Sequence, residues 1–419
     1  MRLALITPLV LAGCFTDPTG ETCVWVPGGD GHCPGDSEGG GSGPQFHRYY
    51  GAAARGVGDQ IRVVMTGRDD SADPIVETTT LYAGEQPVPP SPILDGTKPL
   101  VGEFPQLSVV GDQAFMVWQT RDQSTATYQH GAPLLADGSL GTRHDFGGVN
   151  ATLRRVGNRH FIRSSRSNEI LGTWLRADGE LDATTDLWAE LQPTDIQAET
   201  GDADALYAMA FYNEARTELR IGRVAADGTV LDGLGGLLVA TAPPSFAFDD
   251  VALVATASAE LLVIYGVHDR DYHRDFHAVR VAGTTVTDRL TTDFDGIPML
   301  VVNGDRILAL SRMPTSQEHF EARVLDTSGT VLSGPVYAGK RPNGNTHPIA
   351  LGDAFALVAP IEHISITTLA ANGAAGIHTI VASNYELENA GGCNAAGTSS
   401  PWLLLLALGA ITRSRARAR

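Results

Sequence analysis

The segment from His268 to His277 contains the densest group of ionisable side chains in the chain. If its second half is extended, alternate residues point to the same side of a strand, which places His273, Asp275 and His277 on one face. Two imidazoles and a carboxylate form a workable ligand set for a transition metal. The segment therefore contains a candidate metal site.

A solvated hairpin loop is the alternative for this segment, because alternating charges keep an outer strand soluble. Arg68-Asp69-Asp70 and Arg121-Asp122 occupy equivalent places without a histidine, so we favour the loop. Asp69-Asp70 and Asp249-Asp250 offer hard oxygen ligands, which leaves calcium open as a stabilising ion. We expect no other cofactor and assign no catalytic residue.

Sequence signatures of common enzymes are absent. The chain has no Gly-x-Ser-x-Gly elbow, no paired zinc motif and no dinucleotide-binding fingerprint. His347, His363 and His378 are spread through the last part of the chain and are interpreted as packing or surface residues. The formal net charge is −18, which repels phosphate backbones and disfavours nucleic acid as a partner.

The four cysteines divide by position. Cys23 and Cys33 are close together in a Gly-rich segment, which in an exported protein predicts a disulfide. A metal site with His32 is the alternative, but it lacks the paired spacing of zinc sites. Cys14 and Cys393 belong to segments that direct localisation.

The first such segment is at the N-terminus. A short apolar run behind Arg2 closes with Leu11-Ala12-Gly13-Cys14, which predicts a lipoprotein signal peptide over residues 1–13 and lipid attachment to Cys14. Phe15 follows in place of the aspartate that retains lipoproteins at the inner membrane, so we expect export to the outer membrane or cell surface. Residues 14–45 then read as a flexible, Gly-rich tether.

The second segment covers residues 390–419. Gly391-Gly392-Cys393 precedes the apolar run Trp402–Leu408 and a terminal group of arginines: Arg413, Arg415, Arg417 and Arg419. This arrangement resembles the cysteine-containing C-terminal sorting tails of myxobacterial surface proteins. The resemblance implies processing near Cys393 and a short hydrophobic helix that acts as a sorting or transmembrane tail.

A two-part signature recurs between these segments. Its first part is a turn followed by a short apolar run, which suits a buried strand. The seven runs are Ile61–Val64, Phe115–Trp118, His160–Ile162, Leu206–Met209, Leu261–Tyr265, Ile307–Leu310 and Phe355–Val358. Its second part is a glycine turn, at Gly84, Gly138, Gly179, Gly228, Gly283, Gly329 and Gly373.

These glycines lie roughly 40 to 55 residues apart, the repeat length of a four-stranded propeller blade. The run Phe115–Asp122, with the Asp-Gly turns, also resembles degenerate β-propeller repeats of secreted myxobacterial proteins. We predict an all-β fold over residues 46–389, a single β-propeller with seven blades, or six as the alternative. Residues 377–383 are expected to close the ring by completing the first blade.

Three functions follow from these observations. The first is a non-enzymatic lipoprotein, anchored to the membrane by its lipid, that displays a propeller to a protein or glycan partner. The second is an extracellular propeller enzyme, a glycosidase or lyase that acts on polysaccharide; two carboxyl groups in a sugar-sized cleft would favour hydrolysis. The third is a calcium-stabilised scaffold.

Overall fold

The computed structural model divides the chain into two compact units: His47–Asn384, and Met1–Phe46 together with Tyr385–Arg419. The structure describes residues 14–16, 22–24, 48–57, 60–68, 74–82, 90–121, 127–146, 149–166, 169–201, 206–256, 259–271, 273–291, 294, 296–313, 316–340, 346–361 and 363–382. In the smaller unit, β1 (Cys14–Thr16) pairs antiparallel with β2 (Thr22–Val24). Cys33, Cys393, the signal segment and the tail lie outside the described residues. Within the described part of the chain, no helix has the length and apolar character needed to cross a membrane.

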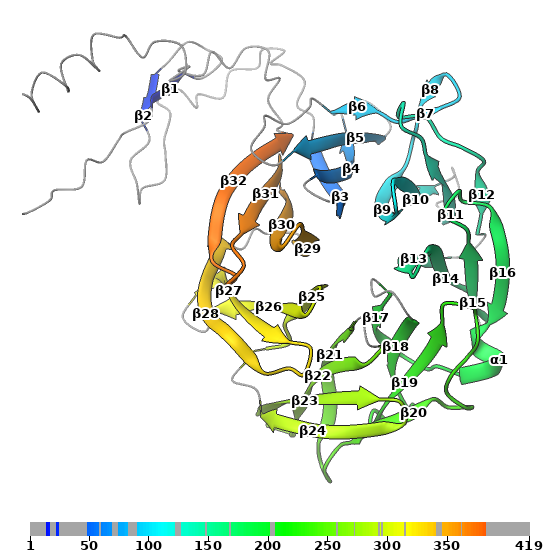
Figure 1. The fold of residues 1–419 in the computed structure, drawn as a ribbon, viewed down its shortest axis with the longest axis vertical. Coiled ribbons are helices and arrows are strands. Elements are labelled where there is room, and N and C mark those ends of the chain that lie inside the picture. Colours follow the sequence, from blue (N-terminus) through cyan, green and yellow to red (C-terminus); the bar gives the residue numbers. More distant parts are fainter. Residues whose placement is uncertain are drawn as a thin grey trace, which may run out of the picture. The chain divides into compact units, whose positions relative to one another are not determined.

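The larger unit forms seven four-stranded antiparallel sheets, which are the blades of one β-propeller (Figure 1). The predicted fold class and blade number are confirmed. The first and innermost strands are β3 (Arg48–Val57), β9 (Glu103–Val110), β13 (Val149–Val156), β17 (Ile196–Thr200), β21 (Ala247–Ala255), β25 (Met299–Asn303) and β29 (His347–Leu351). The second strands are β4 (Gln60–Arg68), β10 (Gln113–Arg121), β14 (Arg159–Arg166), β18 (Leu206–Tyr212), β22 (Leu261–His268), β26 (Arg306–Met313) and β30 (Ala354–Ile361).

Two more strands complete each blade. The third strands are β5 (Ile75–Tyr82), β11 (Thr127–Leu134), β15 (Glu169–Leu175), β19 (Glu218–Ala225), β23 (Arg274–Ala282), β27 (Ser316–Asp326) and β31 (His363–Leu369). The outermost strands are β6 (Ser91–Pro92), β12 (His144–Asp145), β16 (Leu181–Asp186), β20 (Leu237–Thr241), β24 (Thr285–Thr291), β28 (Val331–Lys340) and β32 (Ala375–Ala382). A small hairpin, β7 (Leu94–Asp95) with β8 (Lys98–Pro99), and one short helix, α1 (Leu187–Leu191), lie between blades.

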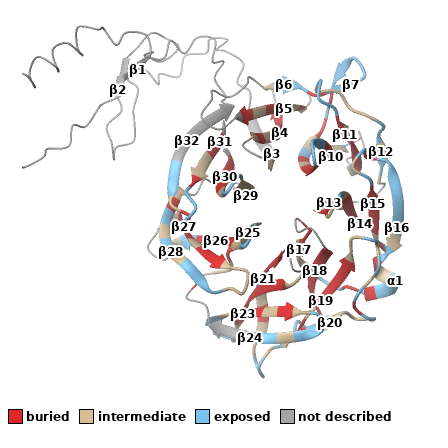
Figure 2. Ribbon diagram, in the orientation of Figure 1, coloured by how far each residue is buried: buried red, intermediate tan, exposed pale blue. Residues whose placement is uncertain are grey.

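Each predicted apolar run lies in a second strand, because both faces of that strand are covered by neighbouring blades. In β18, Leu206, Ala208, Ala210 and Tyr212 pack against blade 5. The residues between them, Tyr207, Met209 and Phe211, pack instead against blade 3. A strand buried on both faces is a continuous apolar run rather than an alternating one. Figure 2 shows the result: second strands such as β18 and β22 are largely buried, and outermost strands such as β16 are largely exposed.

Side-chain packing holds neighbouring blades together around the ring. The described core divides into seven clusters, one at each boundary between neighbouring blades. At the boundary between blades 7 and 1, Ile61 and Val63 pack with Ile349 and Val358. The expected closure by residues 377–383 is wrong: β32 pairs with β31 of its own blade and contributes no strand to blade 1.

Gly84 lies outside the described residues; the other recurring glycine turns connect the third and fourth strands of their blades. In blade 3, Asp178 accepts the backbone N–H of Glu180 at 3.0 Å, and Gly179 follows with a φ of +84°. A Cβ at Gly179 would lie 2.4 Å from Cγ of Pro133 in blade 2. The glycine is therefore required both for its positive φ and for the close approach of two blades.

Substitution of Gly179 by alanine is expected to destabilise the protein more than the same change at Gly138. Both glycines have similar φ values, +84° and +81°, but nothing lies within 4 Å of a Cβ at Gly138. We expect a loss of about 1 kcal/mol for Gly138→Ala from backbone strain alone, and about 2–3 kcal/mol for Gly179→Ala, which adds the clash. Urea unfolding checks the order; equal losses would show that the blade contact contributes nothing.

Candidate functional site

A cavity of about 500 Å³ lies along the centre of the propeller, lined by residues of all seven first strands. We call it the central channel. Most of its lining is aliphatic. Six of its polar residues come from five blades: Arg55, Gln106, Thr152, Arg154, Glu199 and His347.

Glu199 is the only carboxylate among the described residues that line the channel, and it is already paired. It forms an ion pair with Arg163 of β14 and accepts a hydrogen bond from Oγ1 of Thr152 at 2.5 Å. The side chains of Glu199 and Arg163 are only 5% and 10% exposed. Burial raises the pKa of the adjacent Tyr207 hydroxyl well above its ordinary range, and the Glu199 carboxylate raises it further. These groups form a closed polar link between blades 3 and 4.

Gln106 performs a similar role between blades 2 and 3. Its Nε2 donates to the carbonyl of Ala151 at 2.7 Å, and its Oε1 accepts the backbone N–H of Leu153 at 2.7 Å. Both ends of the amide are therefore occupied by backbone groups of the next blade. Arg55 and Arg154 bond to their own strands: Nη1 of each donates at 3.0 Å to the carbonyl of the preceding residue.

The predicted metal face is not brought together. His273 lies in the turn before β23, where Asp269 accepts the backbone N–H groups of Asp271 and His273, each at 2.9 Å. The ring of His277 stacks on Tyr265 at 5.3 Å. Metal-ligating atoms of Asp269, Asp271 and His273 lie within 4.8 Å of one another. In this exposed turn the Asp269 carboxylate holds the backbone, and its pKa is lowered chiefly by the His273 N–H.

Of the acidic turns considered for calcium, Asp69-Asp70 lies outside the described residues and Asp249-Asp250 lies in β21. Nε of Arg274 is 2.7 Å from Oδ2 of Asp249. A guanidinium thus already occupies one of the two carboxylates that a cation would need.

A chain of hydroxyl, imidazole and carboxylate groups lies in blade 2, at His130. Oγ1 of Thr120 is 2.7 Å from Nε2 of His130, and Nδ1 is 2.6 Å from Oδ1 of Asp145. This order of groups occurs in hydrolase triads. However, Nη2 of Arg143 lies 2.8 Å from Nδ1 and 3.0 Å from Nε2.

Arg143 decides whether this series of hydroxyl, imidazole and carboxylate groups can act as a catalytic triad. Burial lowers the pKa of His130; the Asp145 bond opposes that effect, and the charge of Arg143 reinforces it. A general base must become an imidazolium, which Arg143 disfavours. Arg143 also lies over the ring of Trp118, 5.7 Å from its centre. We interpret the cluster as a structural network that fastens β12 to β11.

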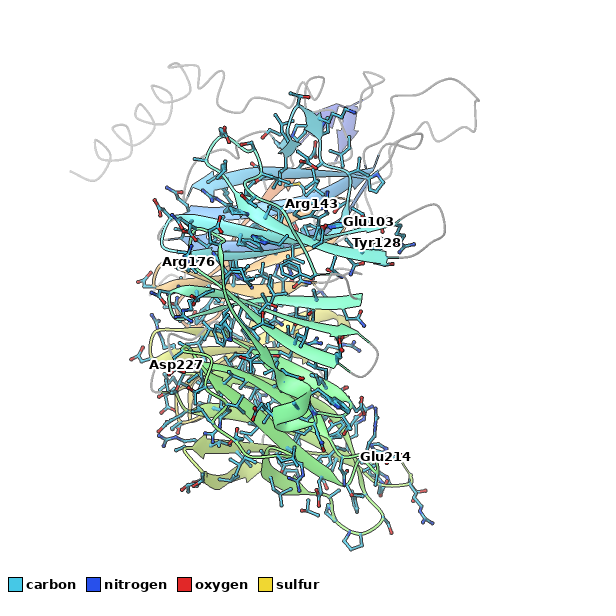
Figure 3. All side chains as sticks on the ribbon, turned by 90° about the vertical axis from the view of Figure 1, so that its right-hand side faces the viewer. Glu103, Tyr128, Arg143, Arg176, Glu214 and Asp227 are labelled. Carbon is cyan, nitrogen blue, oxygen red and sulfur yellow. The ribbon has the colours of Figure 1, made fainter. Side chains whose placement is uncertain are left out.

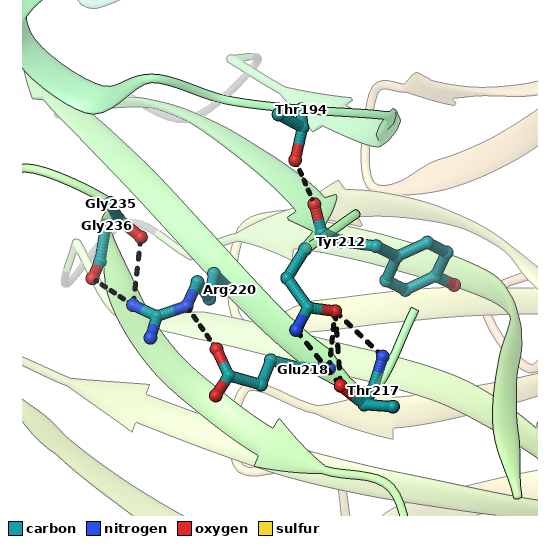
Figure 4. Close-up of polar contacts among 8 residues, drawn as sticks. Thr194, Tyr212, Thr217, Glu218, Arg220, Gly235 and Gly236 are labelled. Carbon is teal, nitrogen blue, oxygen red and sulfur yellow. Dashed lines mark hydrogen bonds and ion pairs between the residues drawn. The ribbon is translucent and has the colours of Figure 1, made fainter. Parts of the chain in front are cut away.

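Polar groups in blade 4 form another internal network (Figure 4). Nη1 of Arg220 donates to the carbonyl of Gly235 at 3.0 Å, and its Nε donates to Glu218 at 2.9 Å. Oδ1 of Asn213 accepts the backbone N–H groups of Thr217 and Glu218. These bonds shape a hairpin and the loop before β20, so this network is structural.

The two faces of the propeller carry different connections (Figure 3). In this edge-on view, Arg176 and Asp227, which lie in turns between third and fourth strands, are at one face. Tyr128 and Glu214, which lie at hairpins between second and third strands, are at the other. Since consecutive antiparallel hairpins alternate between ends, the turns between first and second strands belong to the first of these faces, which we call the turn face.

His160 joins blade 3 to blade 2 as a neutral, fully buried imidazole. Its Nε2 donates to the carbonyl of Ala177 at 3.3 Å, so its Nδ1 accepts from the Ser108 hydroxyl at 2.9 Å. Burial lowers the pKa of His160 from 6.5 to about 4. The charged form is thus strongly disfavoured in the folded protein.

We therefore expect His160 to destabilise the fold as the pH falls from 6.5 to about 4. In this window the unfolded chain binds a proton at His160 that the folded protein does not, and the loss reaches about 3 kcal/mol at its lower end. His160→Gln removes this titration and is expected to flatten the dependence of unfolding free energy on pH. Urea unfolding at several pH values checks it; an unchanged slope would contradict the assignment.

No protein-family model matches the chain, and no curated protein matches its sequence. Solved structures do match. The lectin BP39L from Burkholderia pseudomallei is 11% identical, with a TM-score of 0.54, and the match covers 80% of this chain and 100% of the lectin. The polysaccharide lyase Uly1 is 11% identical, with a TM-score of 0.45 and coverage of 88% and 96%. The β-propeller domain of the Trilobed protease from Pyrococcus furiosus is 10% identical, with a TM-score of 0.46 and coverage of 82% and 100%. At 11% identity and a TM-score of 0.54, the likeness to the lectin shows a shared fold and nothing further.

Proposed function

We propose that this protein is a non-enzymatic binding module, displayed at the cell surface, that takes a glycan partner into its central channel. The observation that carries the proposal is the channel itself: a ligand-sized cavity with polar groups from several blades. Glycosidases use two carboxyl groups about 5–10 Å apart. The one carboxylate among the described lining residues, Glu199, is held by Arg163 and Thr152, which supports binding over hydrolysis.

A glycan array probed with the full chain tests this function. A glycan that binds is then added in solution, and amide hydrogen exchange is measured. Protection is expected in the first strands β3, β9 and β13, which line the channel, and not in the outer strands β16, β20 and β28. Absence of binding to any glycan, or protection confined to the outer strands, would contradict the proposal. In the second case the partner would bind the rim, as a protein would.

The location of the protein is part of the same proposal. A lipid on Cys14 would hold the propeller at the outer membrane through the Gly-rich tether, a disulfide would join Cys23 to Cys33, and the tail would be processed near Cys393. The lipid is expected to be the anchor.

Metabolic labelling with a fatty-acid analogue checks the lipid on Cys14. The wild type is expected to carry the label, and Cys14→Ser is expected to lose it, because the thioether sulfur is removed. Cys23→Ser is the matched control and should remain labelled. Label of equal strength on all three proteins would sink the assignment.

A polysaccharide lyase is the second candidate function, and His347 favours it. This imidazole lines the same channel as Arg55 and Arg154. In a uronic acid, arginines could neutralise the carboxylate while an imidazole takes the adjacent carbon-bound proton and the glycosidic oxygen leaves. The product would carry a new carbon–carbon double bond, which separates this function from binding.

A further inference from the structure

The central channel has one side that is entirely apolar. Among the described residues that line it, blades 5 and 6 contribute residues 253–255 and 299–302, and none of these has a polar side chain. We call these residues the apolar wall. Every polar side chain of the described lining comes from the other five blades. In the ring of seven blades, β25 of blade 6 lies across the channel from β9 and β13, which carry Gln106 and Thr152 (Figure 1).

Strand β25 is the part of the apolar wall that a ligand in the channel reaches. All five residues of β25 are half-buried, whereas residues 253–255 of blade 5 are at most 7% exposed. Alternate residues of β25 pack toward different neighbours, Leu300 toward blade 5 and Val301 toward blade 7. Because each side chain is only partly covered by these contacts, the rest of its apolar surface faces the channel.

The backbone of β25 adds hydrogen-bonding groups to this wall. In the described part of the chain β25 pairs with β26 alone, from Met299 opposite Leu310 to Asn303 opposite Arg306. Its other edge faces the channel, because β25 is the innermost strand of its blade (Figure 1). An edge strand presents backbone N–H and carbonyl groups along its open side. The apolar wall therefore combines apolar side chains with backbone hydrogen-bond donors.

We infer that the channel recognises an acyl substituent of its saccharide ligand through the apolar wall. The inference rests on the proposed function and specifies its ligand class. An acetyl ester places a methyl group, which apolar side chains favour, beside a carbonyl oxygen, which accepts a backbone N–H. A sugar that carries hydroxyl groups alone would turn some of them toward the wall, which costs free energy. A fatty acid would match the wall but would place hydrocarbon against the polar side of the channel, which also costs free energy.

Titration calorimetry on the full chain tests the inference with two probes: a short O-acetylated xylo-oligosaccharide, and the same oligosaccharide after saponification, which removes only the acetyl groups. The wild type is expected to bind the acetylated probe at least about tenfold more tightly, which corresponds to about 1.4 kcal/mol. Val301→Thr adds a hydroxyl group to the wall at nearly constant volume and should reduce this preference to about threefold or less. Met299→Gln, an independent change in the same strand, should do the same. Neither variant should change the affinity for the saponified probe.

Val331→Thr is the matched control, because this valine is 52% exposed in the outermost strand β28, does not line the channel, and should leave both affinities unchanged. A thermal melt confirms that each variant is folded. Equal affinity for both probes, or a preference that Val301→Thr and Met299→Gln leave intact, would overturn the inference and leave the proposed function standing. Binding of neither probe, while other glycans bind the array, would also overturn it. Failure of every glycan to bind would remove the proposed function as well, and tighter binding of a free fatty acid would overturn the inference in favour of a lipid ligand.

Discussion

Replacement of Asp232 by alanine is expected to lower the free energy of unfolding by about 3–5 kcal/mol, because it leaves a buried guanidinium without its counter-ion. Arg223 donates from Nη2 to Oδ1 of Asp232 at 2.6 Å and from Nε to Oδ2 at 3.0 Å. Its Nη1 reaches the carbonyl of Gly283 in blade 5 at 2.7 Å. The two side chains are only 5% and 3% exposed. The pair thus fixes blade 4 internally and also joins it to blade 5.

Two further variants test whether the loss of stability comes from leaving a buried charge unpaired or from breaking any ion pair. Arg176→Ala breaks an exposed pair with Asp178, whose side chains are 54% and 53% exposed, and should cost less than about 1 kcal/mol. The double change Arg223→Met with Asp232→Leu removes both charges and should recover part of the loss. Chemical unfolding measures all three. A loss below about 1 kcal/mol for Asp232→Ala would refute the uncompensated-charge argument.

Replacement of Phe161 by alanine is expected to cost a similar amount, about 3–5 kcal/mol, because it opens a cavity at a blade boundary. Phe161 of β14 is fully buried, with its ring centre 4.5 Å from that of Trp174 in its own blade and 4.2 Å from that of Tyr207 in blade 4. Leu187 of α1 packs in the same cluster. The ring therefore contributes to the contact between two blades rather than to one sheet alone.

Leu234→Ala is the control for this change, because Leu234 is 67% exposed and should cost no more than about 0.5 kcal/mol. Guanidinium chloride unfolding, followed by tryptophan fluorescence, compares the two variants. Equal midpoints would mean that the boundary between blades 3 and 4 repacks without loss.

The repeat could be predicted from the sequence because both of its parts have local physical causes. The second strand of each blade is buried on both faces, so it forms an uninterrupted apolar run such as Leu206–Tyr212. The turn glycine must adopt a positive φ, as Gly179 and Gly228 do. The apolar second strand recurs in all seven blades, and the positive-φ glycine recurs in the six blades whose turn the structure describes, so the blade number followed from counting them.

Two features could not be predicted in this way: how the ring closes, and the presence of the helix α1. Whether the last strand joins blade 1 or blade 7 depends on which edge it meets, and β32 has no local feature that decides between them. The helix α1 is only five residues long, although it has local signals: Asp186 accepts the N–H of Ala189 at the N-cap, and Leu187 and Leu191 share its buried face.

The channel was missed because its polar residues are far apart in the sequence. Arg55, Arg154 and Glu199 come from three blades and meet only through the circular arrangement of first strands. The one available signal was charge in strands that are otherwise apolar, such as Arg154-Arg155 within β13. The ionisable cluster at His273, by contrast, was conspicuous in the sequence because its residues are adjacent, and it lies in an exposed turn.

Native mass spectrometry of the full chain, incubated with a short oligosaccharide that binds it on the glycan array, tests the central claim most directly. We expect one intact, unmodified oligosaccharide bound per chain in the wild type, and loss of this complex in the Arg55→Gln and Arg154→Gln variants, because both residues line the channel. Fragments with an unsaturated terminal residue would assign a lyase, and saturated fragments would assign a hydrolase. An intact ligand that binds equally to the wild type and both channel variants would contradict the channel as its site.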